Sequence, residues 1–288
     1  MKAALGVEGE REVKIPVLLI KFLISNNIEG ENQVLNKIRI STAFVLSSLV
    51  LSSPATAQQF VDDVQDFAVW GNITATGNFS SFNPNNPTLA KVKWWAEGQG
   101  RFADDASKFS QAIVRPGLGY QLTDTISVWV GYAWTPTTTP YVKNTYDEHR
   151  VWQQVLWSDK FSWGRLTARS RLEERFVPDH IGTASNPGDP SPANSTMAAR
   201  YRQLIKASIP LSFAPGFSYI IQDEAFVSLN DTDWVPRRGF DQNRFFTGLG
   251  YAFTKQITGE VGYMNQYIIR RGANYMGHVL SVNLLMNF

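Results

Sequence analysis

From residue 67 onward, hydrophobic and polar residues alternate along the chain with a period of two. In the first such segment, Phe67 and Val69 fall on one side, whereas Trp70 and Asn72 fall on the other. This is the period of a β-strand, whose successive side chains point to opposite faces, and no sustained helical stripe interrupts it. The pattern therefore predicts an all-β fold.

The alternating segments have the length of membrane-crossing strands. Eleven of them lie at about residues 67–76, 92–102, 111–121, 126–135, 148–157, 166–176, 200–209, 218–224, 242–253, 257–269 and 277–288. A tilted strand crosses a bilayer with roughly 9 to 11 residues. Short turns, such as residues 123–124 and 158–163, alternate with long polar loops, such as residues 136–146 and 178–196. This arrangement is typical of outer-membrane barrels.

The polar faces of these strands carry unusually many charges. Arg169, Arg171, Glu173 and Arg175 share one face of a single strand, and such a face cannot lie in a dry core. A soluble β-sandwich also has the two-residue period, but it predicts shorter strands and few Trp or Tyr residues at strand ends. We therefore predict that residues 58–288 form a transmembrane, up-and-down antiparallel β-barrel.

The number of strands conflicts with a simple rule. A bacterial barrel with both termini in the periplasm has an even number of strands, whereas the pattern contains eleven. We expect twelve strands, with the missing one in residues 80–89. Ten strands is the alternative, if one segment does not cross.

The N-terminal region has the layout of a secretory signal peptide. Lys37 and Arg39 precede an apolar run over residues 43–51, which is too short to span a bilayer as a helix. Ala55 and Ala57 then form the small-x-small cleavage pattern, so the mature chain is expected to begin at residue 58. Residues 34–57 are thus the predicted signal peptide. We expect residues 1–33 to result from a misassigned start codon, and a genuine long leader is the alternative.

Composition agrees with export to a bacterial envelope. The chain has 9 Trp, 10 Tyr, 18 Phe and 21 Gly residues but no cysteine, which suits an oxidising compartment. The net charge of +2 and the lack of Lys/Arg runs argue against a nucleic-acid partner. The expected location is the outer membrane of a Gram-negative bacterium, with outer-membrane lipid as a partner.

The C-terminus resembles the signal by which the barrel-assembly machinery recognises its clients. A terminal aromatic residue closes an alternating strand whose apolar members are Leu280, Val282, Leu284, Met286 and Phe288. We expect this machinery to be a second partner of the chain.

Six short segments resemble the DUF2490 family of outer-membrane proteins. They are residues 65–70 (QDFAVW), 147–150 (DEHR), 169–173 (RSRLE), 200–202 (RYR), 223–226 (DEAF) and 242–244 (QNR). The resemblance implies a fold and a location but no biochemical activity, and it leaves the loops at residues 80–89 and 178–196 without an interpretation.

Fifteen charged residues fall on the predicted inward face, ten of them basic and five acidic. They are Glu97, Arg101, Arg115, Glu148, Arg150, Arg169, Arg171, Glu173, Arg175, Arg200, Arg202, Lys206, Glu224, Arg244 and Glu260. One interpretation is a narrow, passive, water-filled pore that favours small anionic solutes. The other is a purely structural barrel whose lumen is closed by Arg and Glu pairs.

An outer-membrane lipid-modifying hydrolase is the alternative from a different class. The chain has three histidines, His149, His180 and His278, and the alternation puts His149 and His278 on the outward face. Neither has a Ser and an acid at a recognisable spacing, and the chain has no phosphate loop, HExxH motif or Cys/His cluster. We therefore expect no enzyme activity, no cofactor and no metal.

Overall fold

A computed structural model describes most of the chain from residue 63 onward. The described residues are 63–80, 82–83, 85–139, 145–178, 182–183, 186–187, 196–232, 234–235, 238–270 and 273–288. The predicted leader (1–33), the predicted signal peptide (34–57) and its cleavage residues Ala55 and Ala57 lie outside them.

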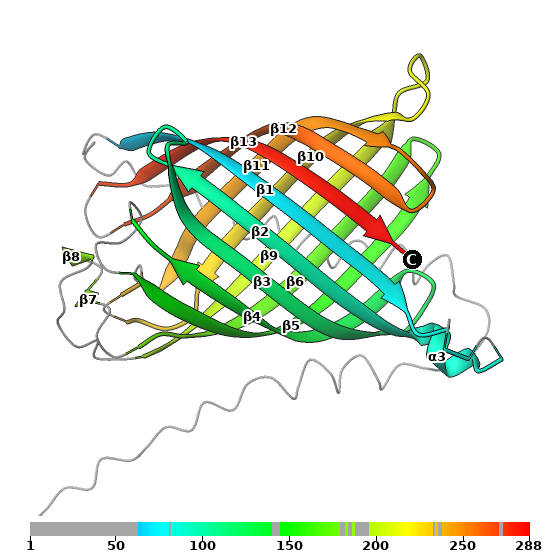
Figure 1. Ribbon diagram of the computed structural model, residues 1–288, viewed down its shortest axis with the longest axis horizontal. Coiled ribbons are helices and arrows are strands. Elements are labelled where there is room, and N and C mark those ends of the chain that lie inside the picture. Colours follow the sequence, from blue (N-terminus) through cyan, green and yellow to red (C-terminus); the bar gives the residue numbers. More distant parts are fainter. Residues whose placement is uncertain are drawn as a thin grey trace, which may run out of the picture. The chain divides into compact units, whose positions relative to one another are not determined.

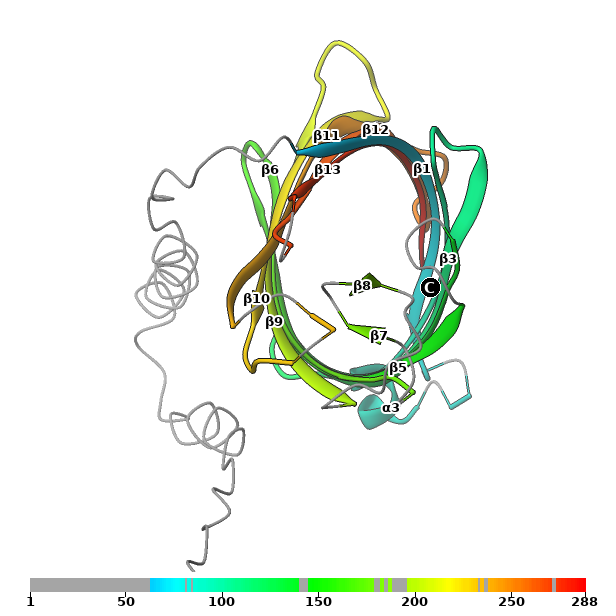
Figure 2. The same ribbon diagram turned by 90° about the vertical axis from the view of Figure 1, so that its left-hand side faces the viewer.

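Eleven strands form a closed barrel (Figures 1 and 2). They are β1 (Val64–Asn78), β2 (Val92–Ala103), β3 (Lys108–Gln121), β4 (Ile126–Thr137), β5 (Tyr146–Phe161), β6 (Gly164–Phe176), β9 (Met197–Pro210), β10 (Phe217–Ser228), β11 (Gly239–Ala252), β12 (Ile257–Ile268) and β13 (Tyr275–Asn287). Two short strands, β7 (Gly182–Thr183) and β8 (Asn186–Pro187), pair only with each other. Each of the eleven alternating segments of the sequence lies on one barrel strand and extends at most one residue beyond it.

The predicted twelve strands, and the alternative of ten, are wrong. Ten neighbouring pairs are antiparallel, and β1 closes the barrel by pairing with β13 in parallel, from Val64 opposite Tyr275 to Thr76 opposite Asn287. Figure 1 shows these two strands running side by side in the same direction. An odd number of up-and-down strands makes the first and last parallel, and a parallel ladder closes such a barrel.

Residues 80–89 do not supply a twelfth strand. Their described part contains turns and the start of a short helix, α3 (Pro87–Lys91). The Asn86 side chain caps this helix by accepting a hydrogen bond from the Thr88 backbone N–H (3.0 Å), and Pro87 suits its first turn. Among the described residues, we find no helix that is both long and apolar enough to cross a membrane.

The two ends of the barrel differ in their connections. At the end where β1 begins, residues 138–145, 177–196 and 229–238 join successive strands, and we call this the long-loop end. At the opposite, short-turn end, residues 122–125 and 253–256 form tight connections, although the segment with α3 also lies there. Because β1 and β13 are parallel, β1 begins at the long-loop end whereas β13 ends at the short-turn end.

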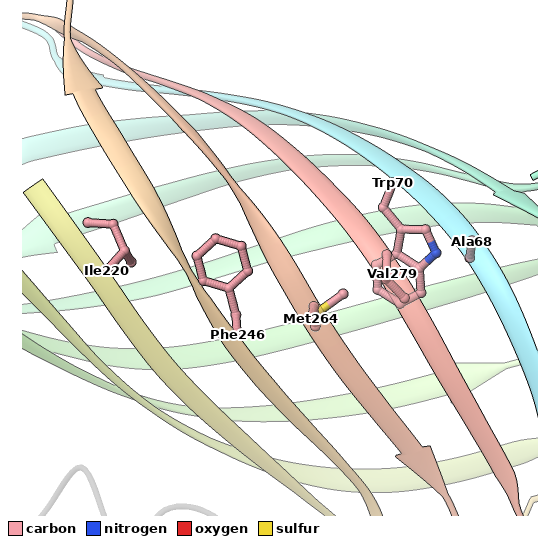
Figure 3. Close-up of a cluster of buried hydrophobic side chains, with 6 residues drawn as sticks. All are labelled: Ala68, Trp70, Ile220, Phe246, Met264 and Val279. Atoms are coloured by element: carbon pink, nitrogen blue, oxygen red, sulfur yellow. The ribbon is translucent and has the colours of Figure 1, made fainter. Parts of the chain in front are cut away.

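Apolar side chains fill part of the interior. One cluster gathers residues from β1 and from β10 to β13, namely Ala68, Trp70, Ile220, Phe246, Met264 and Val279 (Figure 3). On the opposite wall, the fully buried Trp152 lies against two glycines. A Cβ atom would come within 2.6 Å of the indole at Gly117 and within 2.3 Å at Gly131, so these inward positions must be glycine.

The outward face of the barrel is apolar. Side chains such as Ile73 and Val130 are more than half exposed in the middle of their strands. Exposed aromatic residues gather near both strand ends: Phe67, Phe102, Phe109, Trp134, Phe176 and Phe240 toward the long-loop end, and Tyr120, Phe161, Trp163, Phe213, Phe217, Tyr251, Phe253 and Phe288 toward the short-turn end. A soluble protein rarely exposes apolar surface of this extent.

Candidate functional site

The charged residues predicted for the inward face all lie in the barrel interior. Each of the fifteen occupies an inward position on a barrel strand and is buried or half-buried. The five residues of the predicted assembly signal lie on the outward side of β13 and just beyond it, with Leu280, Val282 and Phe288 exposed.

Three glutamates, Glu148, Glu173 and Glu224, each bind two arginines. Glu173 of β6 accepts hydrogen bonds from Arg200 Nη2 (2.7 Å) and Arg202 Nη1 (2.6 Å) of β9. Arg202 also donates from Nη2 to Glu224 Oε2 (2.9 Å), and Arg169 donates to the same carboxylate (2.6 Å). These contacts link three neighbouring strands, β6, β9 and β10, through one continuous network.

The other acids predicted for the interior also have basic partners. Glu148 binds Arg150 (Nε to Oε1, 2.8 Å) and also pairs with Arg175. Glu97 binds Arg115 Nη1 at 2.5 Å. Glu260 binds Lys206 Nζ at 2.6 Å. Since an isolated buried ion costs several kcal/mol, these pairs offset part of the cost of placing so many charges inside the barrel.

Two arginines are held by neutral amides. Arg101 donates from Nη1 to Gln111 Oε1 (2.7 Å) and from Nη2 to Gln99 Oε1 (2.8 Å). Arg244 donates from Nε and Nη2 to the side-chain oxygen of Gln242. This holds in the amide orientation in which that oxygen faces the donors of Arg244 and Gln266. Among the described residues, no carboxylate lies within 4.0 Å of the Arg244 guanidinium, so its charge is not neutralised by an ion pair.

Arg101 and Arg244 stack on the same indole. The Cζ atoms of Arg101 and Arg244 lie 3.9 Å and 5.0 Å from the ring centroid of Trp70. The two guanidinium groups are therefore at most about 9 Å apart, where like charges repel by roughly 2 kcal/mol at an effective dielectric of about 20. Contact with the indole offsets some of this repulsion.

A cavity of about 200 Å³ lies among these side chains, in the half of the barrel nearer the long-loop end. Its lining residues are Trp70, Gln99, Arg101, Gln111, Arg115, Thr137, Tyr146, Glu148, Arg150, Arg175, Arg200, Arg202, Gln242, Arg244 and Gln266. Seven of these are arginines and one is a carboxylate, so the cavity wall is strongly basic.

Sequence reasoning missed some residues of this site. A register shift in the β10 and β11 ladder beside Phe226 places two consecutive residues, Asp241 and Gln242, inside the barrel. Asp241 Oδ2 lies 3.6 Å from Arg200 Nη1 and adds a sixth acid to the interior. Strict alternation places only one of two consecutive residues inside, so it could not reveal a β-bulge. The glutamines that hold arginines are uncharged, and nothing in their pattern marked them.

The outward histidines make local pairs. The Tyr263 hydroxyl lies 2.7 Å from His278 Nδ1, and Tyr132 pairs with His149 in the same way. In both pairs the rings are stacked, with interplanar angles of 28° and 29°. His180 lies outside the described residues. Within the described part of the chain, no group of three His, Cys, Asp or Glu residues is placed to hold a metal ion.

The six segments with family resemblance meet in the interior. They contribute Trp70, Glu148, Arg150, Arg169, Arg171, Glu173, Arg200, Arg202, Glu224, Phe226, Gln242 and Arg244. Segments that are far apart in the sequence thus build one wall of ion pairs and the cavity beside it.

The fold and this interior define a closed β-barrel with a charged lumen. The model of a family described as "Protein of unknown function (DUF2490)" matches residues 67–277, and the chain belongs to this family, which confirms the resemblance seen in the sequence. An uncharacterised protein of Methylorubrum extorquens is 30% identical over 250 residues, which cover 86% of this chain and 98% of that protein. Among solved structures, the NanC porin in a rhombohedral crystal form is similar with 16% identity and a TM-score of 0.39, over 72% of this chain and 90% of that one.

Proposed function

We propose that this protein is an outer-membrane barrel that passively admits small anions to a narrow, basic lumen. The observation that carries the proposal is the wall of the cavity, in which seven arginines face one carboxylate. A lumen with surplus fixed positive charge concentrates anions and repels cations, as rings of Arg and Lys do in anion pores.

The outward face supports the membrane location. Exposed aliphatic side chains cover the middle of the strands, and exposed aromatic residues lie toward both strand ends. Ten residues of a strand tilted by about 40° span roughly 25 Å, which is the height of the apolar band in barrels of this class. The predicted signal peptide and C-terminal assembly signal agree with this location.

A purely structural barrel is the second candidate. Arg171, Glu173 and Trp152 have no exposed surface, so the interior beside the cavity is packed with side chains. Arg171 is fixed there by Gln154 (2.6 Å) and lies 4.6 Å from the Trp152 ring centroid. Such packing favours a lumen that stabilises the barrel without conducting ions.

Double replacement of Arg169 and Arg171 by Gln separates these candidates. For an aqueous anion path, we expect the variant barrel to fold and to conduct in planar bilayers with a weaker anion preference. For a structural lumen, the same change removes Arg169 from Glu224 and the Arg171 charge from beside Glu173 (3.9 Å), so the thermal stability falls and neither protein conducts. That second result would refute the proposed function.

We also propose that the barrel has no hydrolase activity. A hydrolase of this kind needs a Ser nucleophile, a His base and an acid that contact one another. His149 and His278 on the outward face pair with Tyr132 and Tyr263 instead. A phospholipid-hydrolysis assay on the same purified barrel should give the background rate, and turnover that depends on His149 or His278 would contradict this expectation.

A further inference from the structure

One sector of the outward face departs from the apolar pattern. Five neighbouring strands, β5, β6, β9, β10 and β11, each place a polar side chain on this face. We call these side chains the polar sector; they are Gln153, Ser170, Gln203, Asp223 and Asn243. The first four stand at the seventh or eighth residue of strands that are 12 to 16 residues long, so they lie in the middle of the barrel wall.

The apolar band of the outward face is interrupted at the same place. On β6 and β9, whose residues are all described, Phe176 and Met197 are the only exposed large hydrophobic side chains, and both lie at strand ends. Elsewhere the band continues through the middle of the strands, with three valines that are 46–49% exposed, namely Val114, Val261 and Val282. Within the polar sector, Asp223 is itself exposed. Because lipid tails offer no hydrogen-bond partner, an exposed carboxylate at this depth is unfavourable unless another protein covers it.

The polar sector keeps donors and acceptors that its own contacts do not use. Asp223 Oδ1 accepts a hydrogen bond from Asn243 Nδ2 (2.9 Å), which uses one of the two N–H groups of that amide and one of several lone pairs of the carboxylate. Gln153 Oε1 is buried and has no hydrogen-bond partner among the described residues. The pair of Asp223 and Asn243 therefore presents a matched acceptor and donor to the outside of the barrel.

We propose that a second copy of this chain packs against the polar sector in the membrane, around a twofold axis beside Ala225. This small residue points outward from β10 and lies opposite Gln203 on one side and Asn243 on the other, so it permits a close approach. Copies that insert in the same direction are related by an axis along the membrane normal, and each residue then meets residues of equal depth. The second N–H of each Asn243 amide is donated to Asp223 of the other copy, so each carboxylate receives two donors.

A second copy suits this surface better than an unrelated membrane protein does. An unrelated partner needs its own polar group at the same depth of its lipid-facing surface, and the group that best matches Asp223 is a lysine or an arginine. Basic side chains cost more than acidic ones at the lipid-facing midplane of a barrel. A second copy needs no such group. The inference rests on the membrane location in the proposed function, but not on an anion path through the lumen.

Single-cysteine variants test the contact directly, because the chain has no cysteine of its own. Ala225→Cys places a thiol beside the proposed axis. The matched control is Val114→Cys, which is also outward and in the middle of its strand but lies five strands away around the barrel. After oxidation of the purified variants, inserted at high dilution in phosphatidylcholine vesicles, we expect a disulfide-linked dimer from Ala225→Cys and monomer from Val114→Cys.

A second measurement tests the hydrogen bonds between copies. Energy transfer between labelled barrels in the same vesicles gives the dissociation constant of the dimer. Asp223→Leu and Asn243→Leu should each weaken the dimer by about tenfold or more, as loss of hydrogen bonds to a charged group does. His278→Leu removes an outward polar side chain of β13, outside the polar sector, and should dimerise as the unaltered chain does. Heat-modifiable migration of Asp223→Leu checks that this variant still folds.

An inserted barrel that stays monomeric at every ratio of protein to lipid overturns the proposal. So does equal cross-linking of Ala225→Cys and Val114→Cys. Association that requires an added outer-membrane extract would assign the polar sector to a different protein and would also overturn it. A barrel that does not insert into vesicles contradicts the membrane location as well, whereas an inserted monomer that conducts anions leaves the proposed function intact.

Discussion

At the scale of single residues, the interior is organised by carboxylates that each serve more than one arginine. Glu173 is the central case, because it has no exposed surface and binds Arg200 and Arg202 from the neighbouring strand. Removing one member of a buried ion-pair group leaves the others desolvated and uncompensated. The stability of the barrel should therefore depend on individual acids of this network.

Glu173→Gln tests this dependence. Because the change leaves Arg200 and Arg202 without the charge that they share, we expect the free energy of unfolding to fall by about 3–5 kcal/mol. Urea denaturation of the folded barrel in lipid vesicles measures this quantity.

The next residue provides the control for that experiment. Glu174 points to the opposite side of β6 and its described contact is a hydrogen bond with Gln153 at 3.4 Å. Glu174→Gln should change the stability by less than about 0.5 kcal/mol, as surface substitutions usually do. Equal losses for the two variants would show that the buried network does not stabilise the barrel.

The sequence predicts which residues face inward but not which of them meet. The two-residue period is a local property, so the alternation within each strand was enough to predict that both Arg169 and Glu224 point into the barrel. Their hydrogen bond joins positions 55 residues apart, and it depends on the relative register of β6, β9 and β10. Asp241 was missed for a related reason, because the bulge that turns it inward appears only when β11 is paired with β10.

At the scale of elements, the turn between β2 and β3 shows how one side chain fixes a hairpin. Asp104, Asp105 and Ala106 have positive φ values of 59°, 55° and 60°, which is unfavourable for residues other than glycine. Asp66 of β1 accepts hydrogen bonds from the backbone N–H groups of Asp104 (3.2 Å) and Asp105 (3.0 Å). The first strand thus stabilises a strained turn of its neighbour.

The closing strand β13 depends on its last residue in a similar way. The Phe288 backbone N–H donates to Thr76 O (2.9 Å), and its ring stacks on Trp94 with centroids 6.3 Å apart. Phe288 therefore anchors the C-terminal end of β13 to β1 and β2, in addition to its predicted role as an assembly signal.

Deletion of Phe288 should leave an exported chain that fails to assemble. The deletion removes both the anchor and the recognition residue, whereas Phe288→Tyr keeps an aromatic ring and serves as the control. Heat-modifiable migration on gels reports the folded barrel. Normal amounts of heat-modifiable protein after the deletion would contradict the assembly-signal interpretation.

At the scale of the whole molecule, the eleven alternating segments correspond to the eleven strands of the barrel. The prediction of an even number of strands was wrong. The error came from assuming that β1 and β13 run in opposite directions. Their parallel pairing places the start of β1 and the end of β13 at opposite ends of the barrel. Local alternation contains no information about this pair, because its residues are about 211 positions apart in the chain, as for Thr76 and Asn287.

This topology makes a prediction about accessibility in the cell. If the short-turn end faces the periplasm, an epitope inserted immediately before Val64 should bind antibody on intact cells. An epitope in the turn at residues 122–125 should bind only after the cells are permeabilised. Labelling of the turn, but not of the site before Val64, on intact cells would contradict this orientation.

The ion preference of the unaltered barrel is the most direct test of the central claim that its basic lumen admits anions. The measurement is the reversal potential in a planar bilayer that separates concentrated from dilute potassium chloride. A lumen with surplus arginine predicts a reversal potential with the sign of chloride permeation, and this preference should decline as salt screens the fixed charges. A reversal potential with the sign of potassium permeation, or a folded barrel that passes no current, would contradict the account.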